Sequence, residues 1–91
     1  MKLMLERVKL ALRIKNNKLD TDIQDLIDAC KVDLSIGGVE IVNETDPITA
    51  QAIKLYCKGH FGYDENSQKF VEAYEKLKQS MALCGDYKAV E

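Results

Sequence analysis

The chain has 91 residues, of which 46% are apolar and 31% are charged, and this matches one small globular domain with a modest core. The formal net charge is −2 and basic residues are interleaved with acidic ones, which argues against a domain that grips duplex DNA through a basic patch. No apolar run is long enough to cross a bilayer, and no export signal is visible. The odd number of cysteines, three, fits free thiols in a reducing compartment, so we expect an intracellular protein.

The first predicted helix covers about residues 3–14 and carries two apolar stripes at helical spacing. One stripe consists of Met4, Leu5, Val8 and Leu12. The other consists of Leu3, Leu10 and Ile14. One stripe is enough to dock a helix on a small core, so Leu12 is expected in the core. The second stripe either also contacts the core or forms a surface for a partner, because small domains rarely leave contiguous apolar patches in water.

The second predicted helix begins near Asp20, where Thr21 and Gln24 match a capping box, and ends at Gly37-Gly38. Ile23 and Ile27 are expected in the core because they lie on its apolar face. Aspartates occupy the rest of the helix, and we interpret them as a solvated acidic face rather than a cation site. Val32 and Ile36 lie among these aspartates, off the core stripe, and are candidates for an interface.

The third predicted helix occupies the segment DPITAQAIKLYCKGHFG, residues 46–62, and is the most informative part of the chain. Asp46 is a favourable N-cap and Pro47 fits the first helical position. The segment is apolar nearly all round, which is typical of a helix covered on several sides. Four of its residues are expected in the core: Ile48, Ala52, Leu55 and Tyr56, with Leu55 among the most buried.

The fourth predicted helix runs from about residue 66 to residue 84, with Phe70, Tyr74 and Leu77 on its core stripe. Residues 86–91 are expected to form a loose tail. Apolar and polar residues alternate in the segment Val39-Glu40-Ile41, so this segment could form an extended strand, but an isolated strand is not stable alone. The sequence therefore predicts that residues 1–91 form a single all-α domain, a small bundle of about four helices packed around a buried third helix.

Cys57 and His60 are the main candidates for chemistry. They stand three positions apart on the third helix, which could begin a metal pair or a thiol–imidazole couple. Zinc needs three or four ligands and nucleophilic catalysis needs an orienting partner, yet the sequence has no second histidine and no CxxC pair. We expect a structural role for both, and we predict no catalytic, cofactor or metal site and no enzymatic activity.

Several segments taken in order resemble the small all-α head–tail connector proteins of tailed phages and prophages, often described as DNA-packaging proteins. The first segments are residues 5–9 (LERVK) with residues 12–14 (LRI), followed by Asp22-Ile23, residues 26–30 (LIDAC) and Asp33-Leu34. The later segments are Asp46-Pro47, Ala52-Ile53, the Tyr-x-Lys-x-x-Phe-Gly run of residues 56–62, and residues 70–77 (FVEAYEKL). Each segment alone is a weak signal. The ordered series covers nearly the whole chain and is more specific.

This resemblance implies a structural virion protein without a reaction or cofactor. Such proteins form a ring beneath the portal after DNA packaging, at the head–tail junction of a virion assembled in the host bacterial cytoplasm. Their partners are further copies of the same chain, the portal protein, and tail or head-completion proteins. Genomic DNA passes without specific binding, and no membrane is involved. Leu3, Leu10, Ile14, Val32 and Ile36 are the expected ring interface.

Two other classes of protein remain open on the sequence alone. A small DNA-binding or regulatory domain of the helix-turn-helix kind is the main alternative, although the second and third helices are far apart for that motif. A small enzyme would depend on Cys57 and His60 alone.

Overall fold

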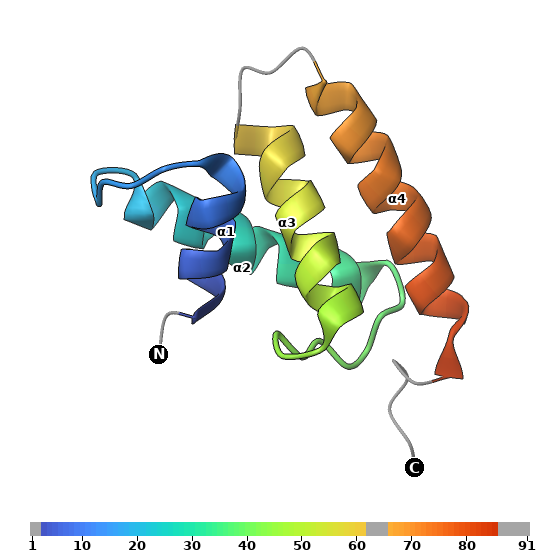
Figure 1. Ribbon diagram of the computed structural model, residues 1–91. Helices are drawn as coiled ribbons and strands as arrows, with labels where there is room; N and C mark the ends of the chain where they lie inside the picture. The colour runs from blue at the N-terminus through green and yellow to red at the C-terminus, as the bar shows by residue number, and fades with distance from the viewer. Residues whose placement is uncertain (1–2, 62–65, 86–91) are drawn as a thin grey trace.

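The computed structural model describes residues 3–61 and 66–85, and every regular element within these ranges is a helix. The helices are α1 (Leu3–Leu12), α2 (Asp20–Ile36), α3 (Pro47–Phe61) and α4 (Ser67–Leu83) (Figure 1). The predicted all-α fold with four helices is confirmed for the described residues. The expected loose tail at residues 86–91 lies outside them.

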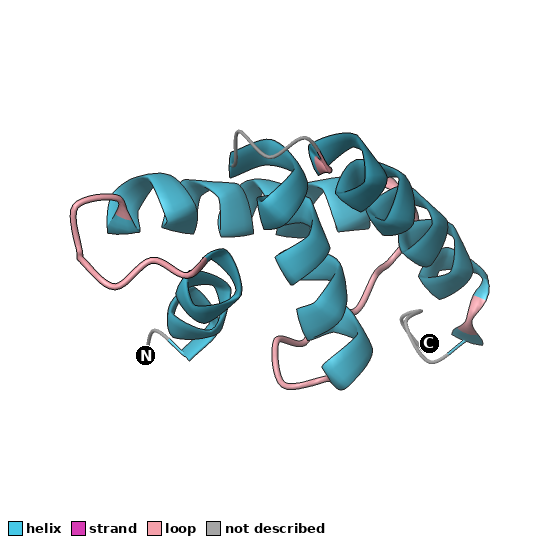
Figure 2. Cartoon of the chain, turned by 45° about the horizontal axis from the view of Figure 1, so that its top comes forward, coloured by secondary structure: helices cyan, strands magenta, loops and turns pink. Residues whose placement is uncertain are grey.

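The third helix is the centre of the bundle, as the sequence predicts, because α3 packs against α1, α2 and α4. In Figure 1, α2 passes behind α1 and α3, and Figure 2 shows α1 and the lower part of α3 on the same side of α2. The helix α4 runs beside α3 and packs mainly on it. The outer side of α2 therefore faces away from the rest of the bundle.

The end of the first helix and the N-terminal cap of the second differ from prediction, whereas the predicted start of α1 and both predicted bounds of α2 are confirmed. The helix α1 ends at Leu12 rather than near residue 14, and Arg13 follows with a left-handed backbone (φ 61°) that turns the chain away. The predicted capping box on α2 is wrong: the N-cap is Leu19, and no side chain caps this helix. Since α2 starts at Asp20, Thr21 lies inside the first turn, where it cannot act as the N-cap.

The predicted start of α3 is confirmed. The Asp46 carboxylate accepts hydrogen bonds from the Thr49 backbone N–H at 2.9 Å and from the Thr49 hydroxyl at 3.1 Å. Pro47 is the first helical residue. The first bond satisfies a donor that the helix itself leaves unpaired, and the second allows the polar side chain of Thr49 to be fully buried.

The predicted core residues divide into four groups. Those that the structure buries are Ile23, Ile27, Ala52 and Tyr74. Those that are partly buried and pack against the core are Leu12, Leu55, Tyr56 and Leu77. Phe70 is half-buried. Ile48 is 47% exposed, so its assignment to the core is wrong.

The error at Ile48 and the overestimate of burial at Leu55 have one cause. The buried face of α3 consists of Thr49, Ala50, Ala52, Ile53 and Cys57. At about 100° per residue, Ile48 and Leu55 lie on nearly the opposite side of the helix. An apolar pattern that extends nearly all round does not distinguish the inward side from the outward side.

The helices α3 and α4 approach closely at Gly59. A β-carbon there would lie 2.6 Å from Cγ2 of Val71 and 3.2 Å from the Val71 backbone nitrogen. Glycine inside a helix costs about 1 kcal/mol relative to alanine, and at this position it gives room for the neighbouring helix. The absence of a β-carbon at Gly59 therefore allows α4 to lie close against α3 at this point.

Candidate interaction surfaces

The outer side of α1 presents one strongly exposed apolar side chain. Leu10 is 79% exposed, while Ile14 is partly buried and packs against the core. The side chain of Leu3 lies outside the described part of the structure. Of the second sequence stripe, Leu10 therefore points outward and Ile14 lies at the edge of the core.

A shallow hollow of about 500 Å³ lies beside Leu10. Its lining residues are Glu6, Lys9, Leu10, Ile14, Lys15 and Asn17. A second hollow of about 520 Å³ opens where the end of α1 meets α3 and α4, and Leu12, Arg13, Lys58 and Phe70 are among its lining residues. Both hollows combine apolar side chains with basic ones.

The outer side of α2 presents a second apolar area. Val32 is 59% exposed and Ile36 is 80% exposed, whereas Ile23 and Ile27 are buried on the inner side. Val32 lies nine positions after Ile23, about two and a half turns, and therefore projects to the opposite side of the helix. The aspartates of α2 beside this area, Asp25 and Asp28, are exposed as expected for a solvated face.

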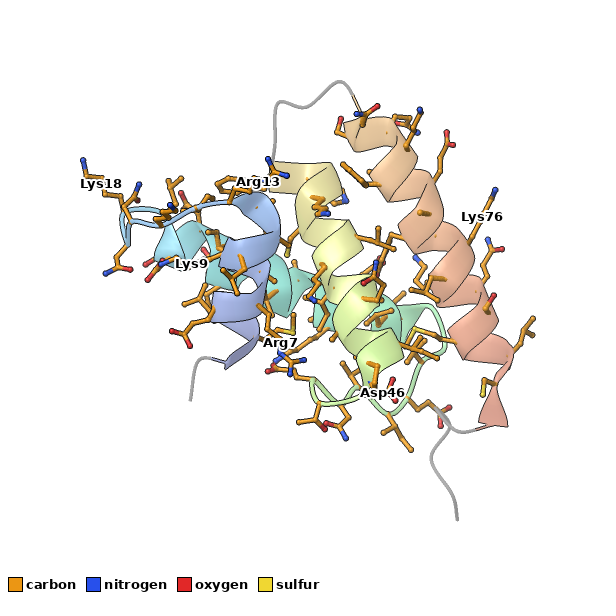
Figure 3. The ribbon with its side chains drawn as sticks, viewed as in Figure 1. Arg7, Lys9, Arg13, Lys18, Asp46 and Lys76 are labelled. Carbon is orange, nitrogen blue, oxygen red and sulfur yellow. The ribbon has the colours of Figure 1, made fainter. Side chains whose placement is uncertain are left out.

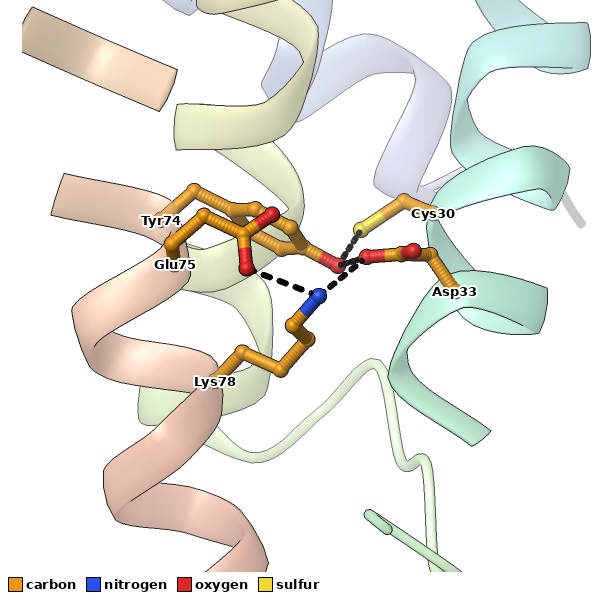
Figure 4. Close-up of polar contacts among 5 residues, drawn as sticks. All are labelled: Cys30, Asp33, Tyr74, Glu75 and Lys78. Carbon is orange, nitrogen blue, oxygen red and sulfur yellow. Dashed lines mark hydrogen bonds and ion pairs between the residues drawn. The ribbon is translucent and has the colours of Figure 1, made fainter. Parts of the chain in front are cut away.

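A polar cluster joins α2 to α4 (Figure 4). The Tyr74 hydroxyl donates to Asp33 Oδ2 at 2.6 Å, and Lys78 Nζ lies 3.0 Å from the same oxygen. Lys78 also pairs with Glu75 at 2.9 Å, and Cys30 Sγ donates to the Tyr74 oxygen at 3.8 Å. The cluster therefore fixes a tyrosine that is buried between the two helices.

The partners in the cluster shift one another's pKa values. Burial alone would raise the pKa of Asp33, but the hydrogen bonds from Tyr74 and Lys78 outweigh it and lower that pKa. Burial raises the pKa of Tyr74, and the bond to Asp33 adds to this effect. Burial also raises the pKa of the Cys30 thiol to about 12. At neutral pH the cluster thus holds a carboxylate, a neutral phenol and a neutral thiol, which is a structural arrangement rather than a reactive one.

Comparison with known sequences assigns the family. A sequence model of the phage connector protein family matches residues 4–88. The chain belongs to the phage connector protein family. Comparison with curated proteins and with solved structures gives no significant match. The resemblance seen in the ordered sequence segments is thereby confirmed, and membership gives this connector a structural role in the phage particle and implies contact with portal or tail proteins.

Cys57 and His60 of the connector do not form a couple. Cys57 is fully buried, and burial raises the pKa of its thiol to about 12. His60 is exposed, and its ring lies against that of Tyr56, with centroids 4.2 Å apart. Within residues 3–61 and 66–85, no three His, Cys, Asp or Glu side chains are grouped as metal ligands. Over the same residues, no helix is both long and apolar enough to cross a membrane.

Sequence reasoning missed the cluster around Asp33. The interpretation of the α2 aspartates as a solvated face includes Asp33, although Asp33 directly precedes the buried Leu34 and follows the buried Cys30 by three positions. That position at the flank of the core stripe is a signal that distinguishes it from Asp25 and Asp28. Its partners, Tyr74 and Lys78, come from a helix more than forty positions later, with separations of 41 and 45 residues.

Proposed function

We propose that this connector assembles into a ring at the head–tail junction, docks on the portal after DNA packaging, and presents a platform for tail or head-completion proteins. The family match over residues 4–88 is the observation that carries the proposal. The ring would form in the cytoplasm of the bacterial host and remain in the virion.

The exposed apolar side chains support self-association. Leu10 on α1 and both Val32 and Ile36 on α2 lie on different helices. A closed ring uses a heterologous interface, in which two different patches of each subunit meet. The expected interface of Leu3, Leu10, Ile14, Val32 and Ile36 thus remains our proposal, with Leu10, Val32 and Ile36 as its most exposed members.

The proposed role includes DNA that passes through the ring without specific binding. The net charge of −2 provides no overall attraction for phosphates. A mobility-shift titration with duplex DNA at near-physiological salt should show no sequence-dependent complex at submicromolar protein. Such a complex would contradict the proposal and favour a DNA-binding domain.

The helix-turn-helix alternative finds no support in the pair α2 and α3. That motif joins two helices by a turn of about three or four residues. Residues 37–46 separate α2 from α3, which is too long a connection.

Binding to the portal is the direct test of the proposal. The purified connector is mixed with portal rings of the same phage, and complexes are analysed by light scattering and negative-stain electron microscopy. We expect an additional annular layer on one side of the portal. Failure to bind the portal at high micromolar connector would overturn the proposal.

A matched pair of variants separates assembly from folding. Leu10→Glu should retain the parent's circular dichroism and lose the annular layer, because the interface would bury an unpaired charge. Leu83→Glu is the control, since Leu83 is 90% exposed at the end of α4, away from the proposed interface. Loss of helicity in Leu10→Glu would instead place Leu10 in the core.

A further inference from the structure

The charges of this chain are not evenly interleaved, contrary to the first interpretation of its composition. Residues 1–19 contain six Lys or Arg and one Glu, whereas residues 20–46 contain eight Asp or Glu and one Lys. Figure 3 shows Arg7, Lys9, Arg13 and Lys18 around α1 and the loop after it, while Lys76 lies apart on α4. The molecule therefore has a basic end formed by α1 and its loop, and an acidic element, α2.

The hollow beside Leu10 belongs to the basic end. Leu10 and Ile14 supply its apolar part, and Lys9 and Lys15 lie among its polar lining residues. Lys9 is held by Asp20 of the same copy at 2.8 Å, while Lys15 is exposed. We call this hollow, with its six lining residues, the α1 groove.

The outer side of α2 has the complementary pattern. Ala29, Val32 and Ile36 are exposed and follow one another at helical spacing. Asp25 and Asp28 are exposed on the same side. We call these five residues the α2 ridge. The α1 groove also contains the exposed carboxylate of Glu6, so Lys15 is the ammonium group that it offers to a carboxylate of the ridge. The apolar stripe of the ridge matches Leu10 and Ile14 in polarity, and Asp25 and Asp28 match Lys15 and the basic end around it in charge.

We infer that the α1 groove of one copy binds the α2 ridge of the next copy, head to tail. The inference rests on the proposed ring and specifies its contact. The two surfaces lie on different helices, one in the basic segment 1–19 and one in the acidic segment 20–46, so the contact is heterologous. Repetition of such a contact gives a ring when the rotation closes.

A second copy fits the groove better than DNA does. Phosphates require basic groups, but they gain nothing from Leu10, which is 79% exposed. Exposed apolar side chains with a polar rim are typical of protein interfaces. The acidic ridge on the same molecule would also repel a nucleic acid and attract the groove of another copy.

Charge reversal and rescue test this contact. Self-association is measured by sedimentation velocity at low salt, and the number of copies on the portal is counted by native mass spectrometry. Lys15→Glu and Asp28→Lys should each weaken association about two- to fivefold, as expected for one exposed ion pair. The double variant should recover part of the loss, and Val32→Glu should weaken association more than tenfold because it buries a charge. Lys76→Glu is the matched control and should associate like the parent.

Several outcomes would overturn the inference. Equal weakening by Lys15→Glu and Lys76→Glu would show a general effect of net charge. Normal rings on the portal formed by Val32→Glu would place the contact elsewhere and leave the proposed function intact. A Lys15→Glu variant that associates normally but loses binding to duplex DNA would make the groove a DNA surface. Absence of both self-association and portal binding in the parent would instead contradict the proposed function itself.

Discussion

The hydroxyl of Tyr74 on α4 donates a hydrogen bond of 2.6 Å to the carboxylate of Asp33 on α2, although the two residues are 41 positions apart. Because α4 packs mainly on α3, this bond is a principal link between α4 and α2. The ring of Tyr74 is buried and meets that of Tyr56 edge-on at 5.1 Å. The orientation of α4 thus depends on a polar bond as well as on apolar packing.

Removal of the Tyr74 hydroxyl tests this link. Tyr74→Phe should lower the free energy of unfolding by about 1–2 kcal/mol, because the ring still fills its site but a hydrogen bond to a charged group is lost. Urea denaturation provides the measurement. A double-mutant cycle with Asp33→Asn isolates the pair, and a coupling energy near zero would show that the bond contributes nothing to stability.

Acid should weaken the same link. The folded-state pKa of Asp33 is lowered, so the unfolded chain binds the proton more readily as pH falls. The contribution of Asp33 is complete above its ordinary pKa of about 4 and is lost as pH falls through the lowered value. Asp33→Asn should therefore flatten the decline of stability that occurs as the pH falls below about 4, measured by urea midpoints. Asp25→Asn, remote from the cluster, should retain that decline.

The close approach at Gly59 predicts a substitution effect opposite to helix propensity. Gly59→Ala should lower the free energy of unfolding by about 1–2 kcal/mol, because the added methyl group overlaps Val71 and this strain exceeds the gain in propensity. Thermal denaturation followed by circular dichroism gives the value. Gly85→Ala is the control, since nothing lies within 4 Å of a β-carbon there. Stabilisation by Gly59→Ala would mean that α4 can shift without cost.

The three cysteines should differ in reactivity with a thiol reagent such as Ellman's reagent. Cys30 and Cys57 are fully buried and their thiol pKa values are raised to about 12, so both should react only when the protein unfolds. Cys84 is partly exposed and should react first. Mass spectrometry of peptides after brief labelling identifies the modified residue, and rapid labelling of Cys57 in the native protein would contradict its burial.

The sequence predicted the helices well because their signals are local. The segment from Asp46 to Pro47 specifies a helix start through one carboxylate and one fixed backbone angle, and the structure has both. The segment near Thr21 contains an equally plausible capping signal that the structure does not use. A capping box at Thr21 would make Asp22 the first helical residue, but α2 begins two residues earlier, at Asp20, with Leu19 as its N-cap.

The interactions between helices were less predictable. Nothing in the neighbourhood of Asp33 reveals that its partner is Tyr74, and nothing next to Gly59 reveals Val71. Ile48 illustrates the same limit, because its exposure depends on which side of α3 the other helices cover. The periodicity of a helix shows which of its faces is apolar. Which other helix packs against that face depends on the fold of the whole chain.

The central position of α3 has a consequence for how the chain reaches its fold. Three of the four main helix contacts join elements that are consecutive along the chain, namely α1 with α2, α2 with α3, and α3 with α4. Helical proteins in which most contacts join residues that are near in sequence fold rapidly, often within milliseconds. Each newly made copy should therefore complete its own helical core before it encounters another, and its exposed leucine and isoleucine side chains would meet finished surfaces rather than unfolded chains. Speed of folding would thus protect a protein that must display apolar groups in order to assemble.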